Sequence, residues 1–127
     1  MIAQYTQAAM VSENKRLAVP ASVDSIPSSG MQEDHVSMGW GAARKLRLSI
    51  ENLRAIISIE IMSAARAIEL RAPLDPAKAT GAVIAELRKH VAGSGRDRYL
   101  APEMASVVLL AKSGAFIRAA KAVTPLR

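Results

Sequence analysis

Four adjacent polar residues, Gln32-Glu33-Asp34-His35, combine side-chain types that can take part in chemistry. They follow a Ser-Ser-Gly turn at residues 28–30 and come just before a long stretch of helical periodicity. A carboxylate near the first turn of a helix is stabilised by unpaired N–H groups and by the positive end of the helix dipole. We therefore interpret Asp34 as the N-cap of that helix. Glu33 would then remain available to bind an ammonium or an imidazolium group, because an ionised carboxylate only accepts hydrogen bonds.

Residue types and spacing also permit a purely structural interpretation of this group. Two acids beside a helix N-terminus are ordinary capping chemistry, and His35 fits a surface position equally well. His35 and His90 have no ligand partner at helical spacing, so we expect no zinc site. The glycines within 93–95 follow a predicted helix and indicate its end, not a phosphate-binding loop. Spacing by itself therefore predicts no metal or cofactor site and leaves the role of Glu33 open.

The composition of the 127-residue chain predicts an all-α protein. Half of the residues are apolar, 22% are charged and only 3% are aromatic. The abundant alanine favours helices over strands, and the apolar content is too high for a disordered chain. No cysteine is present, which excludes disulfides, thiolate metal sites and a cysteine nucleophile, and fits a cytoplasmic location. We expect no signal peptide and no membrane-spanning segment, because charged residues interrupt the most apolar stretch.

A net charge of +6 could reflect an anionic partner such as nucleic acid. However, the basic residues are scattered through several segments that also carry acids, which is typical of a solvated surface. Aromatic residues are not interleaved with basic ones, as they are in proteins that bind single strands. We therefore expect no nucleic-acid partner, and a basic helical nucleic-acid binder is an alternative that rests on net charge alone.

One predicted helix, at about residues 36–71, is unusually long for a chain of this size. At about 1.5 Å per residue it would extend roughly 50 Å. Its apolar residues recur at steps of three or four and form one face, and a second apolar set falls outside that face. This predicts a long central helix with shorter packed helices, as part of a helical-bundle oligomer. The first set is Val36, Trp40, Ala43, Leu46, Ile50, Leu53, Ile57, Ile61, Ala64 and Ile68, and the second is Leu48, Ile56, Ile59 and Met62.

Shorter helices are predicted on either side of the long one. We expect a helix at 2–18 and then a loop at 19–34 that is rich in serine and proline. Asp75-Pro76 has the form of an N-cap followed by proline in the first turn, which predicts a helix at 76–91. Its inward residues should be Val83, Ile84, Leu87 and Val91, and further helices are predicted at 102–112 and 115–122, separated by Ser113-Gly114.

Two runs of residues are distinctive, VPASVDSIP at 19–27 and QEDHVSMG at 32–39. Together they resemble the C-terminal part of histidine ammonia-lyases, which belong to the aromatic amino acid lyase family. The start, MIAQYTQAA, and the segment DRYLAPE at 97–103 are also similar, so the resemblance covers nearly the whole chain. The family commonly has asparagine where this sequence has Met31. Residues 1–127 are therefore expected to form a single helical segment similar to the C-terminal region of a longer lyase.

The resemblance implies an activity and an assembly. Histidine ammonia-lyases eliminate ammonia from L-histidine to give trans-urocanate, the first step of histidine breakdown. Their fold is mostly helical, long parallel helices form the centre of a homotetramer, and several subunits contribute to each active site. The glutamate of the QED motif, here Glu33, faces the substrate and interacts with its imidazole or assists proton transfer, and Gln32 lies in the same wall. Related phenylalanine and tyrosine lyases lack this glutamate, which favours L-histidine as the substrate.

The prosthetic group that the resemblance implies is methylidene-imidazolone (MIO), which forms from an internal Ala-Ser-Gly. This sequence contains no Ala-Ser-Gly, and Ser28-Ser29-Gly30 occupies a different place in the family pattern. We therefore expect no cofactor in this chain, and no activity from the chain by itself. Glu33 is the expected catalytic residue, and Gln32 and Glu33 are the expected substrate-binding residues. The alternative is a non-catalytic helical oligomer, derived from the lyase, with a structural or regulatory role.

Overall fold

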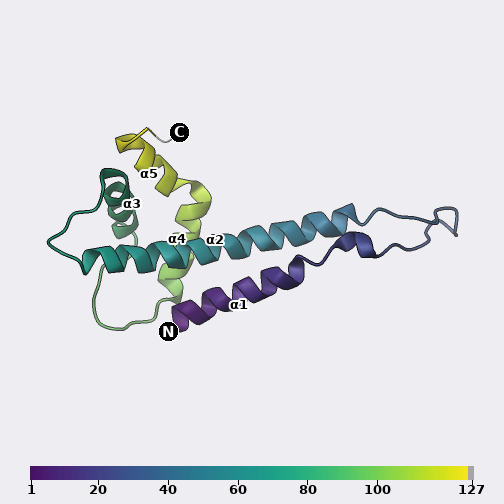
Figure 1. The fold of residues 1–127 in the computed structure, drawn as a ribbon, viewed down its shortest axis with the longest axis horizontal. Coiled ribbons are helices and arrows are strands. Elements are labelled where there is room, and N and C mark those ends of the chain that lie inside the picture. Colours follow the sequence, from purple (N-terminus) through teal and green to yellow (C-terminus); the bar gives the residue numbers. More distant parts are fainter. Residues whose placement is uncertain (126–127) are drawn as a thin grey trace. The chain divides into compact units, whose positions relative to one another are not determined.

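The computed structural model describes residues 1–125, and that part of the chain contains helices and no β-strand (Figure 1). The predicted all-α class is therefore confirmed. The chain divides into two compact units, unit 1 from Met1 to Leu53 and unit 2 from Arg54 onward. The longest helix, α2, contributes residues to both units. The elements are α1 (Ile2–Leu17), the 3₁₀ helix η1 (Ala21–Val23), α2 (Gly39–Glu69), α3 (Lys78–Arg88), α4 (Ala101–Ser113) and α5 (Ala115–Val123).

All the predicted helices are present, but two of them begin later than expected. Helix α2 begins at Gly39 instead of near residue 36, because both backbone groups of Val36 are bonded to a side chain earlier in the chain. Helix α3 begins at Lys78, and the residue before it is Ala77, which supplies no side-chain cap. The predicted Asp75 cap is therefore wrong, because no side chain caps the start of α3.

Unit 1 pairs α1 with the first part of α2 through polar contacts. Asn52 Nδ2 donates hydrogen bonds to Glu13 Oε2 at 2.8 Å and to Asn14 Oδ1 at 2.9 Å. Asn14 Nδ2 donates to the carbonyl oxygen of Ser49 at 3.3 Å, and Lys45 Nζ donates to the carbonyl oxygen of Val19. No residue of α1 is buried. Polar side chains therefore supply the hydrogen bonds between the two helices.

The apolar face predicted for the long helix is exposed in unit 1. Trp40 is 75% exposed, Leu46 60% and Leu53 49%, so the described part of the chain covers these side chains only in part. The contacts with α1 use the polar side of α2 instead. Leu48, from the second apolar set, is also exposed. Much apolar surface of α2 therefore faces outward from unit 1.

Unit 2 contains a small apolar core built from all of its helices. Its buried residues include Leu87 and Val107, which are completely covered, and Phe116, which is 7% exposed. The predicted inward residues of α3 are confirmed, since Leu87 is buried and Val83 and Ile84 pack against the core. Gly114, in the left-handed conformation at φ 76°, lets the chain turn sharply from α4 into α5.

Two arginines hold the 89–100 loop between α3 and α4. The guanidinium of Arg88 donates two hydrogen bonds to the carboxylate of Glu69, at 2.5 and 2.9 Å, and one to the carbonyl oxygen of Ala92 at 3.1 Å. Arg98 binds Glu103 in the same two-bond manner, at 2.5 and 2.9 Å, and also donates to the carbonyl oxygen of Ala92. This loop is therefore fixed by ion pairs to the end of α2 and the start of α4.

Candidate functional site

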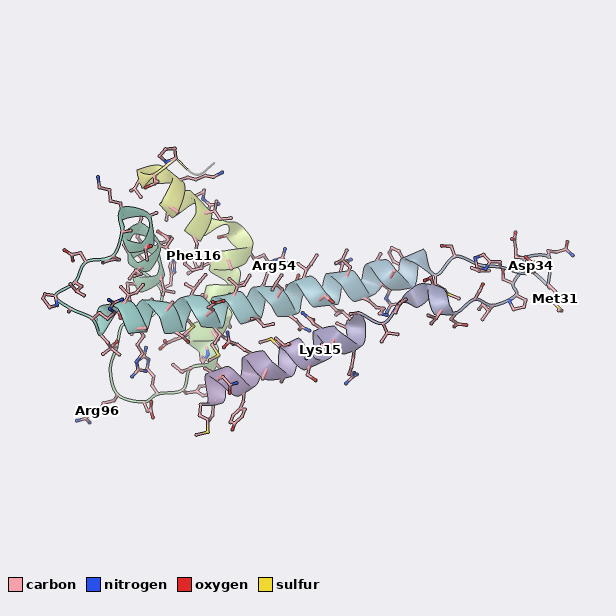
Figure 2. The ribbon with its side chains drawn as sticks, in the orientation of Figure 1. Lys15, Met31, Asp34, Arg54, Arg96 and Phe116 are labelled. Carbon is pink, nitrogen blue, oxygen red and sulfur yellow. The ribbon has the colours of Figure 1, made fainter. Side chains whose placement is uncertain are left out.

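The candidate residues Gln32 and Glu33 lie in the 18–38 loop of unit 1, which joins α1 to α2 and contains η1. Figure 2 shows the labelled Met31 and Asp34 at the closed end of this loop, beyond the first turn of α2. Gln32, Glu33, Asp34 and His35 are all exposed. The structure thus keeps the four polar residues together and presents them outward.

A tight turn places Glu33 through its backbone. The N–H of Ser28 donates to the carbonyl oxygen of Glu33 at 3.0 Å, and the N–H of Glu33 donates to the carbonyl oxygen of Ser28 at 3.3 Å. Within the turn, the N–H of Gln32 donates to the carbonyl oxygen of Ser29 at 3.3 Å. Because the backbone of Glu33 is paired in both directions, its side chain projects from a defined point.

The turn requires three consecutive residues in the left-handed region. Ser29, Gly30 and Met31 have φ values of 53°, 64° and 69°. Glycine adopts this conformation without steric cost, and asparagine tolerates it better than other residues with a side chain. Methionine does not share that tolerance, so the backbone at Met31 is strained.

A second pair of hydrogen bonds closes the loop outside the Ser28–Glu33 backbone pair. The hydroxyl of Ser25 accepts a hydrogen bond from the N–H of Val36 at 2.8 Å and donates one to the carbonyl oxygen of Val36 at 3.0 Å. After this point the Oγ of Ser37 accepts from the N–H of Gly39 at 3.3 Å, and α2 begins. Sequence reasoning missed Ser25, because nothing in its spacing distinguishes it from the other serines of the loop.

The predicted capping role of Asp34 is wrong. The first turn of α2 contains no acid, and Asp34 lies in the loop before Gly39. Glu33 is one residue further from the helix, and it therefore lies outside the first turn, in which the helix dipole acts. The loop backbone, and not the helix terminus, determines where Glu33 lies.

Within residues 1–125, no hydrogen bond or ion pair involves the carboxylate of Glu33. The same part of the chain contains no group of three or more His, Cys, Asp or Glu side chains able to hold a metal ion. None of its helices combines the length and the apolar character needed to cross a bilayer. Chemically, the loop offers an exposed carboxylate beside an exposed amide.

A concave surface in the described part of unit 2 has a different character. It is an open groove of about 310 Å³, and no titratable side chain lines it. Its lining contains no charged group to pair with the ammonium or the carboxylate of an amino acid substrate. Its lining residues are Ile61, Ala64, Ala65, Ile68, Ala79, Thr80, Val83, Ile84 and Ala120.

The chain belongs to the aromatic amino acid lyase family, whose model matches residues 1–89. Among individual relatives, it is 62% identical to the histidine ammonia-lyase of Streptomyces avermitilis over 125 residues. It is 60% identical to the histidine ammonia-lyase of Streptomyces griseus over 127 residues. These matches cover 98% of this chain but only 24% and 25% of the relatives, so the chain spans about a quarter of their length.

Solved structures show the same helical arrangement. The structure superposes on histidine ammonia-lyase from Trypanosoma cruzi with a TM-score of 0.92 and 41% identity, covering 98% of this chain and 25% of that one. Tyrosine aminomutase from Streptomyces globisporus matches with a TM-score of 0.90 and 35% identity, covering 98% of this chain and 24% of that one. A lyase and an aminomutase thus share the fold of this segment, so the fold alone does not determine the reaction.

Proposed function

We propose that this chain supplies one wall of the substrate site of a histidine ammonia-lyase, as a helical segment of that enzyme. Glu33 would contact the imidazole of L-histidine, and Gln32 would lie beside it. The observation that carries the proposal is an exposed, unpaired carboxylate at a turn whose backbone is closed by two sets of hydrogen bonds. Identity of 62% and 60% to the Streptomyces enzymes over nearly the whole chain supports L-histidine as the substrate.

The chemistry of Glu33 suits that role. An ionised carboxylate accepts a hydrogen bond from an imidazole N–H and stabilises an imidazolium. Elimination of ammonia from L-histidine breaks the Cα–N bond and removes a proton from Cβ, giving trans-urocanate. A carboxylate at the imidazole would orient the ring for this step, and Gln32 could both donate and accept a further hydrogen bond. Groups that bind the amine and carboxylate of the substrate would come from other parts of the enzyme.

The MIO group implied by the family does not fit the serines of this chain. Ser28-Ser29-Gly30 is bound into the turn, with both backbone groups of Ser28 paired to Glu33. Cyclisation of these residues would break the turn that places the carboxylate. The proposed role of the chain therefore includes no step at that group, and we expect the 127-residue chain alone to make no urocanate.

Assembly into a homotetramer is part of the same proposal. The exposed apolar side chains of α2, including Trp40, Leu46 and Leu53, would be covered by long helices of other subunits. Apolar residues on one face of a helix commonly form such contacts between helices. The cytoplasmic location expected from the sequence remains a prediction.

A non-catalytic helical oligomer is the second candidate, and the same exposed residues favour it. The two candidate functions differ in whether Glu33 contributes to turnover. Light scattering on the purified chain measures self-association, which both candidates allow. Only the lyase role predicts that the loop contributes to turnover when the rest of an enzyme is present.

The decisive experiment is a chimera in which this chain replaces the matching 125-residue segment of the Streptomyces avermitilis enzyme. We expect the chimera to form urocanate, and Glu33→Gln to lower its kcat/KM by about 30- to 1,000-fold, or about 2–4 kcal/mol. Glu60→Gln, at an exposed acid on α2 and outside the loop, is the matched control and should leave turnover unchanged. An active chimera in which Glu33→Gln also has full turnover would remove Glu33 from the site.

A further inference from the structure

We propose that Ser25 is a positioning residue, whose hydroxyl holds the turn that presents Glu33. The proposal rests on the substrate-contacting role of Glu33 and names the group that controls it. Ser25 is half-buried, whereas its neighbours Asp24 and Ile26 are exposed. Its side chain is therefore directed into the loop, where it can act on the backbone.

The contact that carries the inference is a two-way hydrogen bond across the loop. Ser25 Oγ accepts from the N–H of Val36 at 2.8 Å and donates to the carbonyl oxygen of Val36 at 3.0 Å. A serine hydroxyl has one proton to donate, and Val36 receives it. The hydroxyl thus satisfies both backbone groups of one residue, as a neighbouring strand would do. It has no donor left for a ligand, so its effect on a substrate must pass through another residue.

The hydroxyl lies at the base of the loop that carries Glu33. The outer closure joins residues 25 and 36, and the inner closure joins Ser28 and Glu33. The inner closure is a single bridge pair around three residues in the left-handed conformation, one of which is Met31. A bridge of that size cannot by itself hold a strained turn rigid. The Ser25 hydroxyl restricts the two chain ends that enter and leave the turn.

Restricting this loop matters because catalysis depends on small displacements. A group that contacts substrate has to be held within about 0.5 Å of its productive position. A displacement of about 1 Å can cost on the order of 100-fold in rate. The Glu33 carboxylate makes no hydrogen bond or ion pair within residues 1–125, so the paired backbone of Glu33 is the means of fixing it. Removal of the Ser25 hydroxyl should therefore loosen Glu33 without removing any substrate contact.

The first test measures the closure in the 127-residue chain itself. In Ser25→Ala, hydrogen exchange at the Val36 amide should become about tenfold faster or more, because its acceptor is lost. Ser25→Thr keeps a hydroxyl and should restore most of the protection. Ser22→Ala, at an exposed serine of the same loop, should leave exchange unchanged. Unaltered exchange at Val36 in Ser25→Ala would overturn the closure. This test does not depend on any activity.

The second test uses a double-mutant cycle in the chimera. Ser25→Ala alone should lower kcat by about 10- to 100-fold with a smaller change in KM, and Ser25→Thr should recover most of it. In a Glu33→Gln background, Ser25→Ala should cost less than about threefold, since the group that it positions is already lost. An equal cost in both backgrounds would show that Ser25 stabilises the fold in general, which would overturn the proposal. Full turnover of Glu33→Gln alone would instead reject the role of Glu33, while the exchange result would still decide the closure.

Discussion

Two irregular segments with acidic residues nearby use those acids in opposite ways. In the 89–100 loop of unit 2, Arg88 and Arg98 each bind a carboxylate through two hydrogen bonds. In the 18–38 loop of unit 1, the backbone and the Ser25 hydroxyl make the closing contacts.

The pKa values of Glu69 and Glu103, the two acids bound by arginine, reflect this pairing. Hydrogen bonds from Arg88 lower the pKa of the Glu69 carboxyl, and hydrogen bonds from Arg98 lower that of Glu103. Glu33 has no such partner in residues 1–125. The difference teaches that paired acids fix the 89–100 loop, whereas the 18–38 loop is closed by other groups and the Glu33 carboxylate has no partner within residues 1–125.

The largest expected stability effect is in the arginine-paired loop. Arg88→Ala should destabilise unit 2 by about 2 kcal/mol, because Glu69 and the carbonyl oxygen of Ala92 lose their charged donor. Urea unfolding followed by circular dichroism measures this change. Lys89→Ala, at an exposed neighbour, is the control. Equal effects from the two substitutions would mean that the Glu69 pair does not stabilise the loop.

A decrease in pH should distinguish the stability contributions of the two loops without any mutation. The pKa of Glu69 and of Glu103 is lower in the folded chain than the unfolded value of 4.5. Each ionised carboxylate therefore contributes stability above that value, and the contribution is lost as the pH falls through the lower folded pKa. Denaturant midpoints should decrease from neutral pH to about pH 3, and less steeply in Arg88→Ala. The same slope in both proteins would contradict the pairing.

A smaller change, of opposite sign, is expected in the turn. Met31→Asn should stabilise unit 1 by about 0.5–1 kcal/mol, since asparagine tolerates φ of 69° better than methionine. Slower exchange at the amide of Gln32 would report a tighter turn. Val23→Asn, at an exposed residue with negative φ, is the matched control. A destabilised Met31→Asn chain would show that strain at this position is absent.

The smallest stability effect should come from Glu33 itself. Glu33→Gln should change the unfolding free energy by less than about 0.5 kcal/mol, because the carboxylate has no partner within residues 1–125. The matched substitution Glu69→Gln, at a paired acid, should cost measurably more. A large loss of stability from Glu33→Gln would place that carboxylate among the structural acids and remove the contrast between the loops.

Local patterns were sufficient for the positions of the helices and for the inward face of α3. Helical periodicity placed Leu87 and Val91 in the core, where both are buried. Prediction of caps from residue type failed at the starts of α2 and α3, because neither Asp34 nor Asp75 caps its helix. A cap can be recognised only when the first helical residue is known, and that residue depends on what binds the preceding backbone.

By itself, the sequence determined the all-α class, the family, and the grouping of Gln32 with Glu33, because each depends on neighbouring residues or on helical spacing. Only the tertiary structure decided that the hydroxyl of Ser25 binds Val36, that polar residues join α1 to α2, and that α2 leaves apolar side chains exposed. The Ser25–Val36 and Glu13–Asn52 contacts join residues that are 11 and 39 positions apart along the chain. They form only after loop closure brings those residues together, and no local propensity encodes them.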